Sequence, residues 1–258
     1  MSLSAIILTK NSQDTIVDCL ESVSFCDEIV VVDDYSTDNT ATLISSFKDF
    51  KIKLIKHHLN SDFSSQRNYA MSKTASKWIL FVDSDEVVSE ELSKNIERAI
   101  ESDSYDGYLI KRVDFLWGRK LLHGETAGIN LLRLAKKKKG CWVGKVHEEW
   151  KIKGKISAID GELLHFSHKS VYEFIAKINI YTTIRANELY ESGAKASWWS
   201  VASYPSVKFI LNFVFKRGFL DGEAGFIHAT LMSFHSFLVR SKLFLLRKSI
   251  SKHLSSVR

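Results

Sequence analysis

The first 106 residues contain no glycine, and the whole chain of 258 residues has one proline and three cysteines. Walker A loops and dinucleotide-binding turns need glycine where backbone approaches phosphate, so neither can lie before Gly107. Three cysteines cannot all pair, and none forms a Cys-x-x-Cys, which argues against a disulfide framework or a zinc ribbon and favours a reducing compartment. Any phosphate site in the first part of the chain therefore needs another device.

Long apolar runs are also missing. The run Ala5–Leu8 is short and has no basic region before it, so no signal peptide is expected. The later runs 207–215 and 226–239 are interrupted by polar residues and fall short of the roughly 20 apolar residues that a spanning helix needs. We therefore expect a cytoplasmic chain without a membrane span.

Acidic and basic residues are divided unevenly. Residues 1–110 contain 10 lysines and arginines against 19 aspartates and glutamates, whereas residues 111–258 contain 26 against 11. The formal net charge of +6 therefore combines an acidic first part with a basic second part. The hydrophobic content of 45% is typical of folded chains, and the length suits one large α/β domain or one domain with an appendage.

Short apolar runs alternate with helical patterns as far as residue 102, which is typical of a βαβ sheet. The expected strands are 4–9, 28–32, 53–57 and 77–82, and the expected helices are 12–23, 40–47, 64–75 and 90–102. Ser89 is the expected cap of the last helix. These patterns predict an α/β fold with a Rossmann-like, mostly parallel sheet.

The pattern changes after Tyr108. Residues 108–168 contain short strand-like pieces broken by glycine, which predicts a smaller mixed sheet. The segment Ser170–Glu173 has the sequence of a capping box and predicts a helix start. Beyond Trp198 the chain is aromatic and basic, and we expect its lone proline, Pro205, to mark the beginning of a helix. The predicted divisions are residues 1–110, 111–169 and a helical 170–258.

Two acidic clusters follow buried strands, at the edge where open α/β sheets bind ligands. Asp33 and Asp34 follow strand 28–32; a helix cap accounts for one carboxylate, and a second can accept a hydrogen bond from a uracil or a ribose. Asp83 and Asp85 follow strand 77–82 as a DxD. A DxD suits Mg²⁺ or Mn²⁺ bridging a diphosphate, or, taken alone, an acidic turn before a helix.

Four segments carry these motifs in a characteristic order and spacing: Ile6–Asn11, Val32–Thr40, Arg67–Ala70 and Phe81–Asp85. Together they closely resemble the family 2 inverting glycosyltransferases of GT-A fold. Three later matches are shorter: Gly144–Glu148, Leu164–His165 and Gly218–Gly222. They are similar to the branch that adds glucose to the lipopolysaccharide inner core. The resemblance implies an acidic half for the nucleotide sugar and metal, followed by an acceptor-side sheet.

The resemblance also implies which residues bind the donor. Thr9 and Asp34 match positions that hold the nucleoside, and Asp33 lies beside them. Arg67 matches a basic residue that faces the base or the diphosphate, and Asp83 belongs to the same donor site. The donor implied is a nucleoside diphosphate sugar, with UDP-glucose favoured.

A divalent metal, Mn²⁺ or Mg²⁺, is the implied cofactor. Asp83 and Asp85 match its motif, and Asp85 is the residue expected to contact the ion most directly. His165 matches a histidine that can complete the metal shell, with His168 as the alternative; a structural, hydrogen-bonded histidine is the other interpretation. A metal ion held in this way neutralises charge on a leaving diphosphate.

Glu148 lies where the family places its catalytic base. Displacing a nucleoside diphosphate from a sugar in one inverting step needs one carboxylate that takes the acceptor's proton. Glu149 is adjacent, and neighbouring residues on a strand point to opposite faces, so only one of the two can serve. An exposed polar strand end is the alternative interpretation of both.

The basic second part predicts the acceptor side. A lipid-linked bacterial glycan such as the lipopolysaccharide core is the implied acceptor, reached at the inner face of the cytoplasmic membrane. The aromatic and basic residues from 198 to 219 suit either ordinary helix core or a helix in a membrane interface, and the second is favoured. The run Lys136–Lys139 suits a solvated loop or contact with a phosphorylated acceptor.

Two other functions fit single features of the sequence. Phe81–Val88 also fits the nucleophile motif of a haloacid-dehalogenase-type phosphatase, but that family meets its acidic pair after this motif, whereas here Asp33 and Asp34 precede it. The sequence pI of about 9.0 would suit a nucleic-acid-binding module. No recognition motif accompanies the basic residues, so no nucleic-acid partner is expected.

Overall fold

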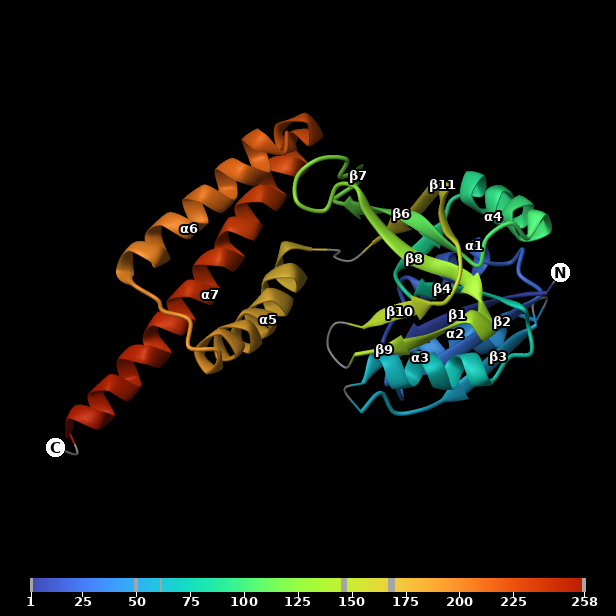
Figure 1. Cartoon of the computed structure of the whole chain (residues 1–258), viewed down its shortest axis with the longest axis horizontal. Coiled ribbons are helices and arrows are strands. Elements are labelled where there is room, and N and C mark those ends of the chain that lie inside the picture. Colours follow the sequence, from blue (N-terminus) through green and yellow to red (C-terminus); the bar gives the residue numbers. More distant parts are fainter. Residues whose placement is uncertain (1, 49–50, 61, 145–147, 167–169, 257–258) are drawn as a thin grey trace. The chain divides into compact units, whose positions relative to one another are not determined.

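The computed structural model describes residues 2–48, 51–60, 62–144, 148–166 and 170–256, with side chains described as far as residue 248. Its elements are labelled in Figure 1. The chain forms two compact units: unit 1 is Met1–Val113 with Gly128–Ser167, and unit 2 is Asp114–Ala127 with His168–Arg258. The predicted divisions at residues 110 and 169 stay a prediction, and each unit is described by itself.

The first half of unit 1 is a parallel sheet with connecting helices. Its strands, in the order β3-β2-β1-β4, are β1 (Leu3–Thr9), β2 (Glu28–Asp33), β3 (Ile52–Lys56) and β4 (Trp78–Asp83). Its helices are α1 (Ile16–Ser22), α2 (Thr40–Ser46), α3 (Phe63–Ser72) and α4 (Glu90–Ser102). Helix α1 begins later than its pattern predicts, because Asn11 is left-handed with φ 51° and a turn follows it. Ser89 caps α4 as expected, accepting from the Leu92 amide.

Antiparallel strands extend this sheet beyond β4. They continue in the order β8-β6-β11-β5: β8 (Ile129–Lys136), β6 (Gly107–Leu116), β11 (Ile156–His165) and β5 (Glu86–Val88). The short strand β7 (Arg119–Lys120) pairs with the end of β6, and a 3-10 turn η1 (Lys137–Lys139) follows β8. A separate hairpin joins β9 (Gly140–Val143) to β10 (Glu149–Ile152). The α/β fold with a smaller second sheet is confirmed, but of residues 108–168 only β9 and β10 form that second sheet, whereas β6, β8 and β11 extend the first one.

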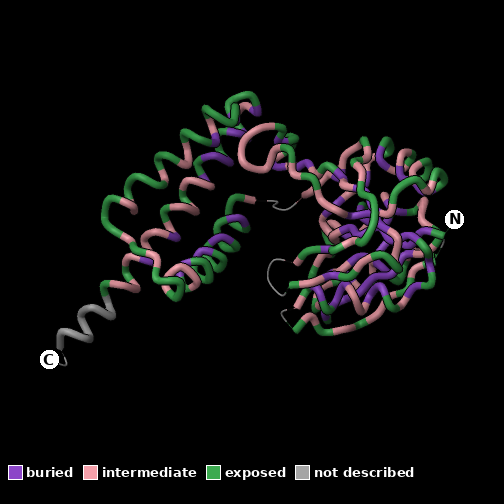
Figure 2. Tube along the Cα trace, in the orientation of Figure 1, coloured by how far each residue is buried: buried purple, intermediate pink, exposed green. Residues whose placement is uncertain are grey.

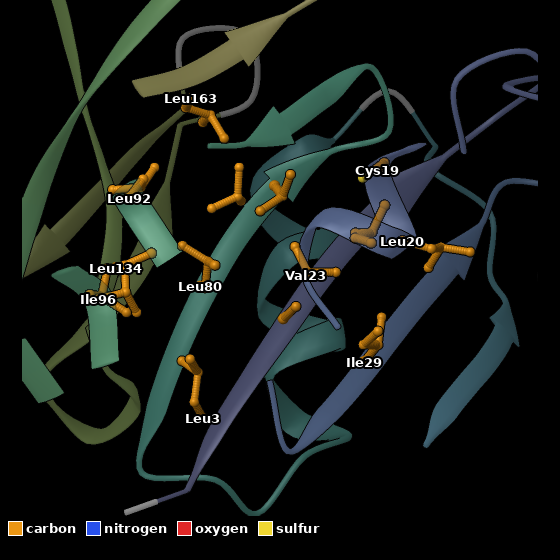
Figure 3. Packing of buried hydrophobic residues seen from close by; sticks show 14 of the residues in the cluster. Leu3, Cys19, Leu20, Val23, Ile29, Leu80, Leu92, Ile96, Leu134 and Leu163 are labelled. Atoms are coloured by element: carbon orange, nitrogen blue, oxygen red, sulfur yellow. The ribbon is translucent and has the colours of Figure 1, made fainter. Parts of the chain in front are cut away.

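Alternate residues of the buried strands enter two cores. Ile7 and Leu80 face one core, together with residues of α1 and α4. Figure 3 shows this core, with Leu3 and Leu80 from strands facing side chains of α1 and α4. The neighbouring Ile6 and Phe81 face the other core, with α3 and the β9–β10 hairpin. The central strands are apolar throughout because both of their faces are covered.

Unit 2 is mainly helical. Its elements are α5 (Val171–Glu191), α6 (Trp198–Ile210), the π-helical turn η2 (Leu211–Phe215), the 3-10 turn η3 (Gly218–Asp221) and α7 (Gly222–Ser256). Ser170 caps α5, accepting from the Glu173 amide. No helix in the described part of the chain is both long enough and apolar enough to cross a membrane.

The expectation that Pro205 marks a helix start is wrong. Pro205 lies inside α6, which begins earlier at Trp198. The start is set instead by a capping box, in which Ser197 and Ser200 each accept from the other's backbone amide. The two amides satisfied in this box define the helix start, whereas Pro205 lies beyond the first turn, the part of a helix that proline favours.

Candidate active site

Asp34 lies at the carboxyl end of β2, where a cation and a backbone amide hold its carboxylate. Lys10 Nζ donates to Asp34 Oδ2 at 2.7 Å, and the Leu59 amide donates to Oδ1 at 3.1 Å. His58 Nδ1 lies 3.5 Å from the same carboxylate. Burial opposes ionisation, but the hydrogen bonds from Lys10 and Leu59 lower the pKa of Asp34 below its usual value. The carboxylate is therefore ionised and fixed in orientation.

Asp33 has a different local role. Its carboxylate is fully buried and accepts from both the amide and the hydroxyl of Ser36, so it shapes the loop after β2. Two residues of this region are left-handed without being glycine: Asn11 with φ 51° and Tyr35 with φ 52°. Asn11 Oδ1 accepts from the Thr37 amide at 2.8 Å, which joins the loop after β1 to the loop after β2. Side-chain hydrogen bonds thus shape two loops that contain no glycine.

Thr9 ends β1 beside this loop. The residue is only 4% exposed, and none of the described residues hydrogen-bonds to its hydroxyl. Buried hydroxyls normally have a partner, so this one points to a group that the protein itself does not supply. Thr9 pairs with Asp33 in the sheet register, and the Asp34 amide donates to the Thr9 carbonyl at 2.9 Å. The structure therefore brings Thr9, Asp33 and Asp34 together.

Asp83 ends β4 between two arginines. Arg67 Nη2 of α3 donates to Asp83 Oδ1 at 3.1 Å, and Arg133 Nη2 of β8 donates to Oδ2 at 2.5 Å. Burial opposes ionisation, but the two guanidiniums hold the pKa of Asp83 well below its usual range. The Asp83 carboxylate, the first of the DxD, is thus ionised, and its negative charge is balanced by the two arginines.

Arg133 and Glu86 complete this network, and the sequence reasoning missed both. Glu86 is fully buried, accepts from Arg133 Nη2 at 3.0 Å and from the Asp83 amide at 2.9 Å. Burial raises the pKa of Glu86, with Arg133 opposing that shift and Asp83 adding to it. A signal was available, because Arg133 is a lone arginine inside an apolar strand, and buried arginines are nearly always paired.

Asp85 and His165 meet beside this network. β11 pairs antiparallel with β5 so that His165 lies opposite Glu86, and the Phe166 amide donates to the Asp85 carbonyl at 2.8 Å. This pairing places His165 Nε2 at 3.6 Å from Asp85 Oδ2. Residues 80 positions apart in the chain, counted from their numbers, are therefore adjacent in space.

This pair fits a divalent cation. Mg²⁺ is commonly held by one or two carboxylates together with substrate phosphates, and imidazole is a common ligand of divalent transition metals. Within the described ranges no three aspartate, glutamate, histidine or cysteine side chains form a metal cluster. Asp83 faces the two arginines instead. The alternative ligand His168 lies outside the described residues.

Glu148 reaches the same centre from the β9–β10 hairpin. Arg67 Nη2 lies 3.6 Å from Glu148 Oε1 as well as close to Asp83, so one guanidinium joins the predicted base to the DxD. Glu148 and Glu149 both line a cleft of about 740 Å³, whose other walls include Arg67, Asp83 and Trp142. Glu148 precedes β10 and is 23% exposed, whereas Glu149 begins the strand and is exposed.

Helix α3 positions this hairpin through its polar face. The Asn68 side chain donates to the Trp142 carbonyl at 2.9 Å and accepts from the Trp142 amide at 3.0 Å, so it replaces a strand partner for β9. The Arg67 guanidinium lies 4.5 Å from the centre of the Trp142 ring. Arg67 Nε and Nη1 are buried without a hydrogen-bond partner among the described residues, so part of this cation remains available to an anion.

Residues 4–151 match the family Glycosyl transferase family 2. This span is more than half of the chain, and the chain belongs to this family. The chain is 30% identical to the lipopolysaccharide core biosynthesis glycosyltransferase LpsC of Rhizobium meliloti, over 95% of this chain and 92% of that protein. It is 28% identical to an uncharacterized glycosyltransferase of Rickettsia typhi, over 93% of this chain and 86% of that protein. The chain is accordingly a glycosyltransferase.

Solved structures show the same fold. The crystal structure of residues 1–349 of Staphylococcus aureus TarS, in complex with UDP-GlcNAc, has a TM-score of 0.52 and 17% sequence identity. The match covers 96% of this chain and 92% of the TarS chain. This likeness confirms the predicted GT-A fold. The family match favours the glycosyltransferase interpretation over the phosphatase and nucleic-acid interpretations.

Proposed function

We propose that this glycosyltransferase moves glucose from UDP-glucose, in a metal-dependent inverting reaction, to a lipid-linked bacterial glycan of the lipopolysaccharide-core type. The observation that supports this best is the cleft in which Arg67 joins Asp83 of the DxD to Glu148. The name of LpsC supports a lipopolysaccharide-core acceptor, and the TarS complexes with UDP-GlcNAc and UDP support a uridine nucleotide.

The nucleoside half of the donor binds at the ends of β1 and β2. The Asp34 carboxylate is ionised and fixed by Lys10, so it is ready to accept a hydrogen bond from a uracil N–H or a ribose hydroxyl. The Thr9 hydroxyl is buried and has no hydrogen-bond partner among the described residues, and such a ligand would supply one. Asp33 contributes indirectly, because it holds the loop that presents Asp34.

The diphosphate half binds toward the DxD. Asp85 and His165 would hold the Mn²⁺ or Mg²⁺ ion, which supplies charge neutralisation for the leaving diphosphate. Arg67 contributes a second positive group through its unpartnered nitrogens. Asp83 pairs with both Arg67 and Arg133, and these contacts support a role in which it acts on the donor through the two arginines.

Glu148 takes the proton of the acceptor hydroxyl. Its carboxylate lies on the cleft wall within reach of Arg67, which fixes its orientation. A single displacement needs only one such base opposite the leaving group, and the product is inverted. Trp142 and Trp150, whose stacked rings lie 5.6 Å apart, are nearly buried and form part of the apolar wall of the same cleft. A lipid-linked acceptor of this kind is met at the cytoplasmic face of the membrane.

Ligand-dependent thermal unfolding tests this assignment. UDP-glucose with Mn²⁺ should raise the unfolding temperature, because a ligand at 100 times its Kd stabilises the folded state by about 2.7 kcal/mol. GDP- and CDP-glucose should have little effect. Asp85→Ala should remove the Mn²⁺-dependent part, whereas Glu91→Ala, which removes an exposed charge on α4, should not. Stabilisation by GDP- or CDP-glucose alone would overturn the uridine assignment.

A further inference from the structure

Helix α6 is apolar, yet none of its residues is buried. Its sequence, WWSVASYPSVKFI, has a single charge. Trp198 is 62% exposed, Trp199 is 75% exposed and Val207 is 62% exposed. Figure 2 shows that α6 has no buried segment, in contrast to the strands of the sheet. Single exposed apolar residues are ordinary, but a continuous exposed run marks an interaction surface.

The exposed surface continues beyond α6 through η2 and η3. Phe215 is 74% exposed and Leu220 is 55% exposed. We define the aromatic face as the exposed large apolar side chains between residues 198 and 220: Trp198, Trp199, Tyr204, Val207, Ile210, Leu211, Val214, Phe215, Phe219 and Leu220. All of them belong to unit 2.

The segment that carries the aromatic face is basic in sequence. No aspartate or glutamate occurs from residue 192 to residue 220, while four basic residues do. Lys208 pairs with Glu125 at 2.5 Å. The other three, Lys195, Lys216 and Arg217, are exposed. A surface of this composition favours a partner that is apolar inside and anionic at its boundary.

The aromatic face is supported from behind by packed rings. The Phe209 and Phe213 rings stack at 5.3 Å, and each meets the Phe226 ring of α7 edge-on, at 5.8 and 5.6 Å. The Ser233 hydroxyl of α7 donates to the Pro205 carbonyl at 2.7 Å, which holds the middle of α6. The exposed side chains therefore project from a preformed platform, and binding does not have to order it.

We propose that the aromatic face docks on a membrane surface that contains anionic lipid, with α6 lying in the plane of the interface. This inference rests on the proposed lipid-linked acceptor and names the surface that brings the enzyme to it. Tryptophan favours the headgroup region, phenylalanine and leucine enter the acyl boundary, and lysine and arginine meet lipid phosphates. A second copy fits less well, because a twofold contact would bring Lys195, Lys216 and Arg217 close to their own copies.

Co-sedimentation with vesicles tests the docking directly. The full chain should bind vesicles of phosphatidylethanolamine and phosphatidylglycerol, and bind phosphatidylcholine vesicles more weakly. Trp198→Ser/Trp199→Ser should lower the partition coefficient at least about tenfold, from the apolar area that the two rings no longer bury. Tyr105→Ser, which removes an aromatic that is 38% exposed in unit 1, should bind like the parent chain. Unchanged thermal unfolding confirms that the variants are folded.

Two double variants that reverse the same number of charges, one on this segment and one in unit 1, show whether the position of the charges or the net charge of the protein decides binding. Lys195→Glu/Lys216→Glu should weaken binding to phosphatidylglycerol vesicles by roughly fivefold or more per residue, because each basic residue near the surface contributes about 1 kcal/mol. Lys138→Glu/Lys139→Glu changes the net charge equally at exposed lysines of unit 1 and should leave binding nearly unchanged. Equal loss in both variants would overturn the assignment to this face.

The depth at which the tryptophans enter the bilayer is measured by the quenching of their fluorescence by lipids with brominated acyl chains. Quenching in the parent chain and its loss in Trp198→Ser/Trp199→Ser supports docking through α6. Absence of vesicle binding by the parent chain, or full binding by that variant, overturns the proposal. A concentration-dependent dimer in sedimentation equilibrium, abolished by the same variant and without vesicle binding, overturns it in favour of self-association. No sugar donor is present in these measurements, so their outcome is independent of the proposed transfer reaction.

Discussion

The tryptophans of unit 1 are buried, whereas those of α6 in unit 2 are exposed. In unit 1, Trp78 and Phe81 are completely buried in the cores around the sheet, and charged residues of the interior meet at one edge as Arg133 with Glu86. In unit 2, Trp199 and Phe215 are about three-quarters exposed, at 75% and 74%. Unit 1 therefore uses its apolar residues for stability and its buried charges for the site. Unit 2 places apolar residues on a surface whose composition folding alone does not explain.

The largest expected effect is the loss of chemistry from unit 1 without loss of fold. Glu148→Gln should lower kcat by about 10²- to 10⁴-fold, the range for removing a general base, because the amide cannot take the acceptor's proton. Glu148 lies on the cleft wall beside Arg67. Donor binding should persist, because the predicted nucleoside site is formed by other residues. Steady-state transfer rates and UDP affinity measure the two properties separately.

Glu149→Gln is the matched control for this variant. Glu149 lines the same cleft from the start of β10 and is exposed. Its substitution should leave kcat within a few-fold of the parent. A Glu149→Gln variant that loses turnover while Glu148→Gln keeps it would reverse the assignment of the base.

A pair of aromatic truncations tests the contrast between the units directly. Phe81→Ala should cost about 3–5 kcal/mol of unfolding free energy, because it leaves a cavity against Trp142 and Trp150, whose rings it meets edge-on. Trp199→Ala should change the unfolding free energy by less than about 0.5 kcal/mol, the range for exposed positions. Urea unfolding measures both. Comparable losses in the two variants would contradict the view that the aromatic face serves binding instead of stability.

The next largest change in unfolding free energy is expected from the buried charges of unit 1. Arg133→Met should lower the unfolding free energy by about 3 kcal/mol, because it leaves Glu86 buried without its cation. Glu86→Gln/Arg133→Met should recover part of this loss, since the buried charge is then removed as well. Arg98→Met, at an exposed position of α4, is the control. Equal stability of Arg133→Met and Arg98→Met in urea unfolding would show that the network is not stabilising.

Local patterns predict much of unit 1. The alternation of apolar runs with helical patterns predicts β1 to β4 and α1 to α4, because each strand must be apolar on two covered faces. The carboxyl ends of parallel strands meet at one edge, so Asp34 and Asp83 could be assigned to a ligand edge from sequence alone. The partners of Asp83 and Asp85 depend on antiparallel pairings of β8 and β11, which bring Arg133 and His165 from distant positions. No local sequence pattern predicts the register of these strand pairings.

Unit 2 is harder to predict for a physical reason. A helix such as α6 has the same apolar composition whether it enters a core or faces a lipid surface, so only the three-dimensional packing separates the two. Pro205 misled the prediction of its start, because proline is acceptable in a first turn and the stronger signal, Ser197 with Ser200, uses two serines. The role of Glu148 as base came from the family resemblance and remains a prediction.

The smallest expected effect is a pH dependence in unit 2. His228 is buried against Phe174, and burial lowers its pKa, while neighbouring acids such as Asp221 partly oppose this lowering. The unfolded chain therefore binds this proton more readily than the folded one, starting near its ordinary pKa of about 6.5. The unfolding free energy should be full above about pH 6.5 and fall as pH drops below it, toward the folded pKa. Urea unfolding between about pH 7.5 and pH 5 measures this slope.

His228→Gln removes that proton and should flatten the slope. His235 is also partly buried with a lowered pKa, so the double variant with His235→Gln should flatten it further. An unchanged slope in His228→Gln would mean that the interior of unit 2 admits a charge as readily as water does. Its exposed aromatic face would then be part of a loosely packed unit, and the contrast with unit 1 would rest on packing instead of on docking.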